Sequence, residues 1–150
     1  MKSLSTILFA TDFTENCEHA FEYALGFARK FGAKLVVMHV INEPVDLRGF
    51  YVPHISFESL EKEIAEGAEA MMQKFCSTQM GEFTDFESCL ATGVPYEEIL
   101  KKAQEVNASL IVMGTQGRTG LDHLLFGSTA ESVFRRATCP VMTVRLPESS

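Results

Sequence analysis

Four glycines lie near the C-terminal end of the chain, spaced so that their small size could serve a chemical purpose; they are Gly114, Gly117, Gly120 and Gly127. Glycine lets backbone N–H groups approach a bulky anion because no Cβ is in the way, and it tolerates the positive φ that phosphate loops often need. Ser128 and Thr129 follow at once and open a predicted helix, whose hydroxyls, free N–H groups and dipole favour an anion. The pattern predicts a polyphosphate site, and therefore a nucleotide as ligand.

The spacing of these residues excludes two familiar kinds of nucleotide site. The sequence contains no Gly-x-x-x-x-Gly-Lys-Ser/Thr, so the lysine of a P-loop is absent, and no Gly-x-Gly-x-x-Gly follows the first apolar run, as a dinucleotide site requires. The pattern present is instead Gly-x2-Gly-x9-Gly-Ser, from Gly114 to Ser128.

Composition narrows the class of protein further. With 150 residues, 46% of them hydrophobic, the sequence suits one domain that buries roughly 68–70% of the surface of its unfolded chain. A net charge of −7 with scattered Lys and Arg argues against nucleic acid or a membrane as partner. The four cysteines have no spacing typical of a disulfide framework or zinc site, and no apolar run reaches transmembrane length. We therefore expect a cytoplasmic protein with reduced thiols.

The elements that must position the glycines follow from hydrophobic periodicity. Short apolar runs alternate with amphipathic ones, which predicts the order βαβαβαβαβ. The expected strands are 5–11, 34–41, 83–90, 109–114 and 140–145, and the expected helices are 14–31, 57–79, 95–106 and 128–137. Residues 42–56 have no clear periodicity, and an irregular loop of this length inside a compact domain is usually functional or mobile.

Alternation of this kind, with continuously apolar strands, indicates a parallel sheet with helices on both faces. Ligands of such sheets bind beyond the carboxyl ends of the strands, where the strand order reverses. The first strand delivers Thr11 and Asp12 to that edge, and the fourth delivers Met113 and Gly114. Two segments that are distant in sequence therefore meet the glycine pattern at one site.

Several stretches, taken together, resemble the ATP-binding branch of the universal stress protein family. These are 7–12, 35–40, 93–95, 110–114, 124–129 and 139–144, which together with the glycine pattern cover nearly the whole chain. The resemblance implies that residues 1–150 form a single domain of the α/β class. It would be doubly wound and Rossmann-like, with a five-stranded parallel sheet in the order 3-2-1-4-5.

The resemblance also implies a ligand and a set of contacts. The ligand is ATP, with or without Mg²⁺, and Val40 becomes a neighbour of the adenine on this ground alone. The candidate binding residues are Thr11, Asp12, Val40, Met113, Gly114, Gly117, Arg118, Gly127, Ser128 and Thr129. No catalytic residue is assigned.

Three functions remain open at this stage. The first is a nucleotide-responsive regulatory module of the stress response, which the intact glycine pattern favours. The second is a slow ATP hydrolase on the same fold, which would need a well-held Mg²⁺ and an activated water. The third is a dimeric stress scaffold that binds no nucleotide. A homodimer is expected in any case, because the terminal strand 140–145 would leave an apolar edge that tends to pair with another chain.

Individual residues also have purely structural interpretations. Asp12 and Glu15 fit a capping box for the first helix, and the glycines could be ordinary loop residues. Arg118 could pair with phosphate or be solvated. His39 and His123 are expected to be structural, because no carboxylate in the sequence is placed to orient either of them.

Overall fold

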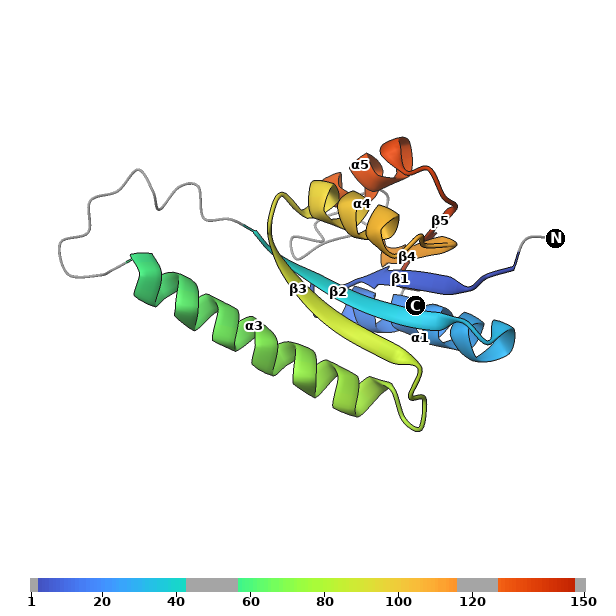
Figure 1. Ribbon diagram of the computed structural model, residues 1–150, viewed down its shortest axis with the longest axis horizontal. Coiled ribbons are helices and arrows are strands. Elements are labelled where there is room, and N and C mark those ends of the chain that lie inside the picture. The colour runs from blue at the N-terminus through green and yellow to red at the C-terminus, as the bar shows by residue number, and fades with distance from the viewer. Residues whose placement is uncertain (1–2, 43–56, 116–126, 148–150) are drawn as a thin grey trace.

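The computed structural model describes residues 3–42, 57–115 and 127–147, and its elements follow the predicted alternation (Figure 1). The predicted loop at 42–56, apart from Asn42, lies outside the described residues. No described helix combines the length and the apolar character that a membrane span requires. The elements are β1 (Thr6–Ala10), α1 (Glu15–Phe31), β2 (Lys34–Asn42), α3 (Phe57–Gln79), β3 (Phe86–Gly93), α4 (Pro95–Glu105), β4 (Leu110–Gly114), α5 (Ser128–Arg136) and β5 (Val141–Val144).

The five strands form one parallel sheet in the order β3-β2-β1-β4-β5, which confirms the predicted fold class and strand order. β1 lies at the centre, where Phe9 pairs with Val37 of β2 on one side and with Val112 of β4 on the other. α1 and α3 cover one face of the sheet, and α4 and α5 cover the other (Figure 1).

The strands are apolar on both faces because helices cover both. In β1, Ile7 and Phe9 belong to the core under α1 and α3, whereas Leu8 and Ala10 belong to the core under α4 and α5. Successive side chains of a strand point to opposite faces, so each strand contributes to both cores. β1 is thereby fixed from both sides, and its carboxyl end is held firmly at the edge where a ligand is expected.

The predicted boundaries of the third strand were wrong. The strand was expected at 83–90, but β3 runs over Phe86–Gly93. The Phe83 N–H donates to the Met80 carbonyl at 3.1 Å, and Gly81 takes a φ of 60°, so this stretch is a turn that ends α3. Phe83 is apolar because it packs against the core from that turn, which is why its hydrophobicity was mistaken for the start of a strand.

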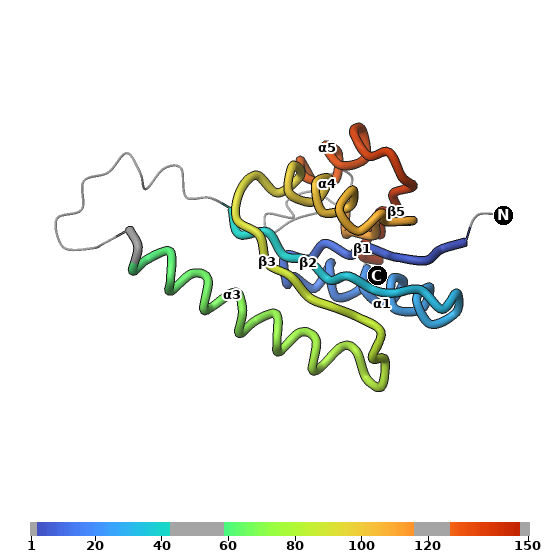
Figure 2. Tube along the Cα trace, in the orientation of Figure 1, coloured from blue at the N-terminus to red at the C-terminus, as the bar shows by residue number. Residues whose placement is uncertain are grey.

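The apolar stripes of two helices extend further than the surface they cover. Phe31 in α1 and Ile64 and Met71 in α3 are apolar, yet all three side chains are exposed. The N-terminal half of α3 projects beyond the edge of the sheet (Figure 2), and the buried residues Ala68, Met72 and Phe75 lie nearer its C-terminal end. Periodicity located the helix but could not show where the sheet stops.

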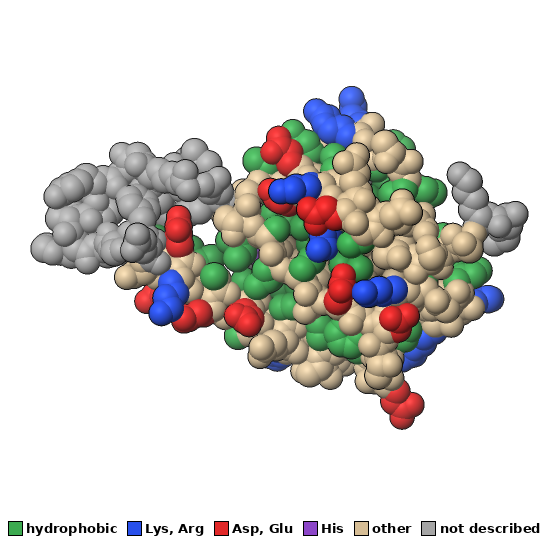
Figure 3. All heavy atoms as spheres, viewed as in Figure 1, with side chains coloured by type: hydrophobic (Ala, Val, Ile, Leu, Met, Phe, Trp, Pro, Cys, Tyr) green, Lys and Arg blue, Asp and Glu red, His purple; other side chains and the backbone are tan. Residues whose placement is uncertain are grey.

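Charge on the face shown in Figure 3 is mixed: Lys and Arg side chains alternate with Asp and Glu rather than forming a stripe. Ion pairs among the described residues include Lys34 with Glu87 at 3.2 Å and Arg135 with Glu131 at 2.9 Å. On this face the molecule therefore has no continuous basic surface of the kind that tracks a nucleic-acid backbone.

Candidate functional site

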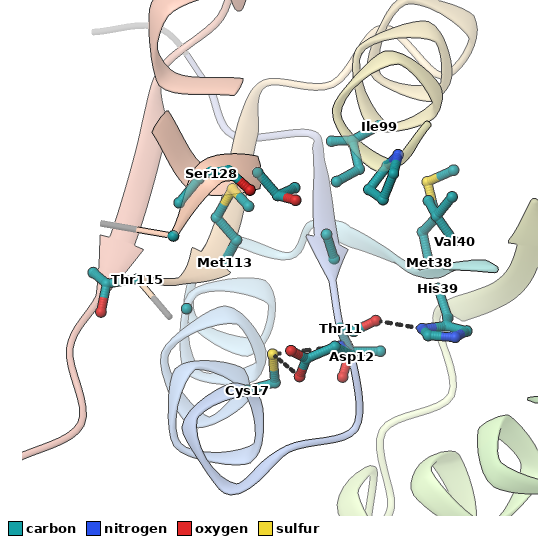
Figure 4. A pocket seen from close by; sticks show the side chains of 16 residues that line it. Thr11, Asp12, Cys17, Met38, His39, Val40, Ile99, Met113, Thr115 and Ser128 are labelled. Carbon is teal, nitrogen blue, oxygen red and sulfur yellow. Dashed lines mark hydrogen bonds between the residues drawn. The ribbon is translucent and has the colours of Figure 1, made fainter. Parts of the chain in front are cut away.

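A cavity of about 190 Å³ lies beyond the carboxyl ends of β1, β2 and β4, next to the N-terminal ends of α4 and α5 (Figure 4). This is the point where strand order reverses, the usual ligand position of such sheets. The lining comes from β1, α1, β2, α4, β4 and α5 and from residues next to their ends. It comprises Ala10, Thr11, Asp12, Cys17, Met38, His39, Val40, Pro95, Ile99, Met113, Gly114, Thr115, Gly127, Ser128, Thr129 and Ala130.

The structure brings most of the predicted site residues to this one cavity. Thr11, Asp12, Val40, Met113, Gly114, Gly127, Ser128 and Thr129 all line it. Gly117 and Arg118 lie outside the described residues. Segments separated by about a hundred residues therefore converge at one site, as the sequence predicted.

Asp12 is held by the first turn of α1, although not by the predicted capping box. The N-cap of α1 is Thr14 rather than Asp12. One carboxylate oxygen, Asp12 Oδ1, accepts hydrogen bonds from the Thr14 N–H at 3.0 Å, from the Thr14 hydroxyl at 2.5 Å and from the Cys17 thiol at 3.0 Å. Glu15 takes no part because the chain turns between Asp12 and the helix, which moves the cap two residues along.

Phe13 makes that turn with an unusual backbone. Its φ is 66°, in the left-handed region that aromatic residues rarely adopt. The Phe13 N–H donates to Thr11 Oγ1 at 2.9 Å, and the Phe13 ring packs on His39 with centroids 4.5 Å apart. The packing and the hydrogen bond hold a conformation that no sequence pattern here predicts.

His39 links the carboxyl ends of β1 and β2. Its Nδ1 lies 2.7 Å from the Thr11 carbonyl oxygen, and since a carbonyl only accepts, Nδ1 carries the proton. This contact is structural, and His39 also lines the cavity.

The two described glycines of the motif do not adopt positive φ, contrary to the general expectation for such loops. Gly127 has φ −65° and ψ 155°, and Gly114 is not among the described residues with positive φ. Gly114 is needed for a different reason, since a Cβ there would lie 2.5 Å from Asn16 Nδ2 in α1. The first glycine of the motif therefore serves close packing of α1 against β4.

The N-terminus of α5 forms one end of the cavity. Gly127 is its N-cap and supplies no side-chain hydrogen bond to the first turn. The Gly127 N–H donates to the Thr115 carbonyl at 2.6 Å, while the Thr115 N–H donates to the Val144 carbonyl at 3.1 Å. The Thr115 side chain is only 8% exposed, and its hydroxyl has no hydrogen-bond partner among the described residues. Helix N–H groups with a neighbouring hydroxyl suit an anion.

The opposite side of the cavity is apolar. Met38 and Val40 from β2 and Ile99 from α4 gather there (Figure 4), and Pro95, the first residue of α4, also lines the cavity. Pro95 and Ile99 were not among the predicted site residues, although Pro95 begins a predicted helix directly after an edge strand. A helix that begins at the carboxyl edge of a parallel sheet brings its first turn near the ligand. The predicted helix start at Pro95 could therefore have identified both residues.

Cys17 was also missed as a site residue. It is 5% exposed and lines the cavity beside Asp12 (Figure 4). Burial, the charge of Asp12 and its hydrogen bond raise the pKa of the Cys17 thiol to about 12. All four cysteines are free in the structure. Within 3–42, 57–115 and 127–147, no cluster of three His, Cys, Asp or Glu side chains could hold a metal ion.

Comparison with known proteins agrees with this fold. The sequence model of the universal stress protein family matches residues 4–145. A putative universal stress protein of Staphylococcus aureus strain USA300 is 35% identical over 99% of this chain and 88% of its own length.

Two solved structures are also similar. That of the MJ0577 protein of Methanocaldococcus jannaschii has a TM-score of 0.84 at 27% identity, covering 99% of this chain and 100% of the other. A universal stress protein from Archaeoglobus fulgidus, solved in complex with dAMP, has a TM-score of 0.59 at 25% identity, covering 94% and 98%.

Proposed function

The chain belongs to the universal stress protein family, and from this premise we propose that it binds ATP and acts as a nucleotide-responsive regulatory module in the stress response. Residues 1–150 act as one nucleotide-binding domain in this proposal. The observation that carries it is the polarity of the cavity, with an apolar side under α4, a helix N-terminus at α5 and a carboxylate between the strand ends.

Each part of an adenine nucleotide has a matching part of this cavity. Val40, Met38 and Ile99 offer apolar contact to the base. Asp12 is an acceptor, so it suits a hydroxyl or amine of the nucleoside and repels phosphate. The phosphates go to the first turn of α5, where Gly127, Ser128 and Thr129 offer N–H groups and hydroxyls.

The remaining predicted contacts complete the proposal. In this proposal Thr11, Met113 and Gly114 contact the nucleoside, and Gly117 and Arg118 bind the phosphates. Mg²⁺, where present, is held chiefly by the phosphates, as is common for nucleotide-bound magnesium. The dAMP complex of the Archaeoglobus fulgidus relative supports an adenine nucleotide as the ligand class.

Two further parts of the proposal concern assembly and location. β5 is an edge strand of the sheet, and we propose that it pairs with β5 of a second copy to form a homodimer. Val144 is only 6% exposed within the single chain, so it belongs to the core rather than to such an interface. Four free cysteines suit the reducing cytoplasm.

Calorimetric titration with ATP tests the binding. Gly127 has ordinary backbone angles that valine can adopt, so Gly127→Val should remain folded by circular dichroism while its added side chain blocks the phosphates. Ser128→Ala removes one hydrogen bond to a charged group and should weaken binding by about 1.5–3 kcal/mol, roughly ten- to a hundredfold. Gly67→Val is the matched control, because nothing lies within 4 Å of a Cβ at Gly67 in α3.

The outcomes separate the three functions. ATP binding by wild type and by Gly67→Val, but not by Gly127→Val, supports the proposal. Wild-type ATP affinity in a folded Gly127→Val protein would show that the phosphates do not bind at the N-terminus of α5, and would overturn the proposed site. Absence of ATP binding by wild type would replace the proposal with the scaffold function. Steady ADP production during a timed incubation of wild type with ATP and Mg²⁺, lost in Gly127→Val, would assign the hydrolase instead.

A further inference from the structure

Cys17 and Asp12 form a hydrogen-bonded side-chain pair in the lining of the cavity. The thiol donates to Asp12 Oδ1 at 3.0 Å, and the Asp12 N–H lies 3.4 Å from Cys17 Sγ. The two residues are thus joined by their side chains and by a backbone group, while both line the cavity. A buried cysteine that served only as a small apolar side chain would not need this double contact.

The three donors to Asp12 all converge on one oxygen. Two come from Thr14, directly after the turn, and the third comes from Cys17, one helical turn further on. The terminal torsion of an aspartate is broad, so donors from a single residue restrain it poorly, whereas donors from two places on the helix fix it. Among the described residues Asp12 Oδ2 accepts no hydrogen bond, which leaves this oxygen for a ligand.

We infer that Cys17 is a positioning residue for nucleotide binding: its thiol fixes the Asp12 carboxylate so that Oδ2 accepts a hydrogen bond from a hydroxyl or amine of the nucleoside. The inference rests on the proposed function and deepens it, because it explains how a carboxylate at a strand end is oriented in advance. Orientation before binding lowers the entropic cost of forming the contact.

The donor role of Cys17 persists over the whole physiological pH range. Burial comes first among the causes that raise its pKa to about 12, followed by the Asp12 charge and hydrogen bond. The thiol therefore stays protonated and can donate wherever the protein works.

A double-mutant cycle on the full chain tests the inference with ATP as the probe. Cys17→Ala removes the donor and should weaken ATP binding about three- to tenfold, or about 0.7–1.4 kcal/mol. Cys17→Ser keeps a donor and should bind within about twofold of wild type, given that a hydroxyl makes at least as strong a bond to a carboxylate. In an Asp12→Ala background, Cys17→Ala should cause no further loss. Cys76→Ala is the control, because Cys76 packs against the same core without lining the cavity.

A second readout needs no nucleotide. Asp12→Ala removes a charge and an acceptor that raise the thiol pKa, so the alkylation of Cys17 by iodoacetamide near pH 9 should accelerate, as followed by peptide mass spectrometry. Alkylation of Cys76 should not change. An unchanged Cys17 rate would show that the pair is not coupled and would overturn the inference.

The outcomes distinguish this inference from the function on which it rests. A wild-type protein that binds no ATP overturns the proposed function and the role of Cys17 in affinity together. If wild type binds ATP, then equal affinity in Cys17→Ala, failure of Cys17→Ser to restore binding, or the same loss in both Asp12 backgrounds overturns the inference alone.

Discussion

Gly114→Ala should destabilise the protein through α1, without any ligand being present. The added Cβ would stand 2.5 Å from Asn16 Nδ2 and 3.1 Å from Asn16 Cγ, and Asn16 is only 8% exposed, so its side chain has little room to move away. Overpacking of this kind costs about 1–3 kcal/mol. For a chain of this size, that loss of unfolding free energy corresponds to a fall in Tm of roughly 2–12 °C.

Urea and thermal unfolding of the ligand-free protein measure this loss, and two further variants show whether its cause is the contact with Asn16. Asn16→Ala removes the atoms that clash, so the double variant should be more stable than the sum of the two single losses predicts. Gly67→Ala, in the exposed part of α3 with open space around it, should instead gain about 0.4–1 kcal/mol. A Gly114→Ala protein as stable as wild type, or strict additivity with Asn16→Ala, would refute the packing explanation.

Three other expectations concern stability, assembly and the turn at the site. Because the pKa of Cys17 is raised from 9.0 to about 12 in the folded protein, its protonated form contributes stability that is complete below pH 9 and is lost as pH rises from 9 towards 12. The unfolding free energy should therefore fall less steeply over that range in Cys17→Ala than in wild type, and parallel curves would contradict the shift. Thr143→Lys places a charge on the edge strand β5 and should convert the proposed dimer to monomer in sedimentation experiments, whereas an unaffected dimer would show that another surface is used. Phe13→Ala loses the ring contacts with His39 and Phe75 while keeping a strained φ, so it should lower the Tm by several degrees. Phe13→Gly should recover part of that loss, because glycine adopts this φ without strain. Equal Tm values for the two variants would exclude backbone strain as a cause.

The sequence was sufficient to predict the sheet, its order and the place of the site. Apolar runs alternating with amphipathic stretches predict a parallel α/β sheet. Because the carboxyl ends of parallel strands share one edge, Thr11 and Gly127 are then expected at the same edge. The sheet and the place of the cavity were predictable because they depend on periodicity and chain order, which a sequence contains directly. The strand order, which the structure confirms, came from the family resemblance. Val40 was also named on that ground; it lines the cavity, and its contact with adenine stays a prediction.

What the sequence could not show depends on distances between side chains. The clash at Gly114 involves Asn16, nearly a hundred positions away, and a glycine motif gives no sign of whether it serves a helix or a ligand. The hydrogen bonds of Asp12 follow from the backbone of Phe13, which adopts a conformation disfavoured for its residue type. The start of β3 was misplaced because an apolar residue in a turn and one in a strand look alike in sequence.

The backbone of Thr115 connects the cavity with the edge strand β5. Its carbonyl accepts a hydrogen bond from the Gly127 N–H at the cavity, and its N–H donates to the Val144 carbonyl at the end of β5. Two hydrogen bonds therefore link the N-cap of α5 to the strand that is proposed to pair with a second copy. Thermodynamic linkage makes any such coupling reciprocal: if nucleotide strengthens association by some factor, association strengthens nucleotide binding by that same factor. With such coupling, the fraction of the protein that carries nucleotide would depend on the concentration of the protein as well as on that of the ligand.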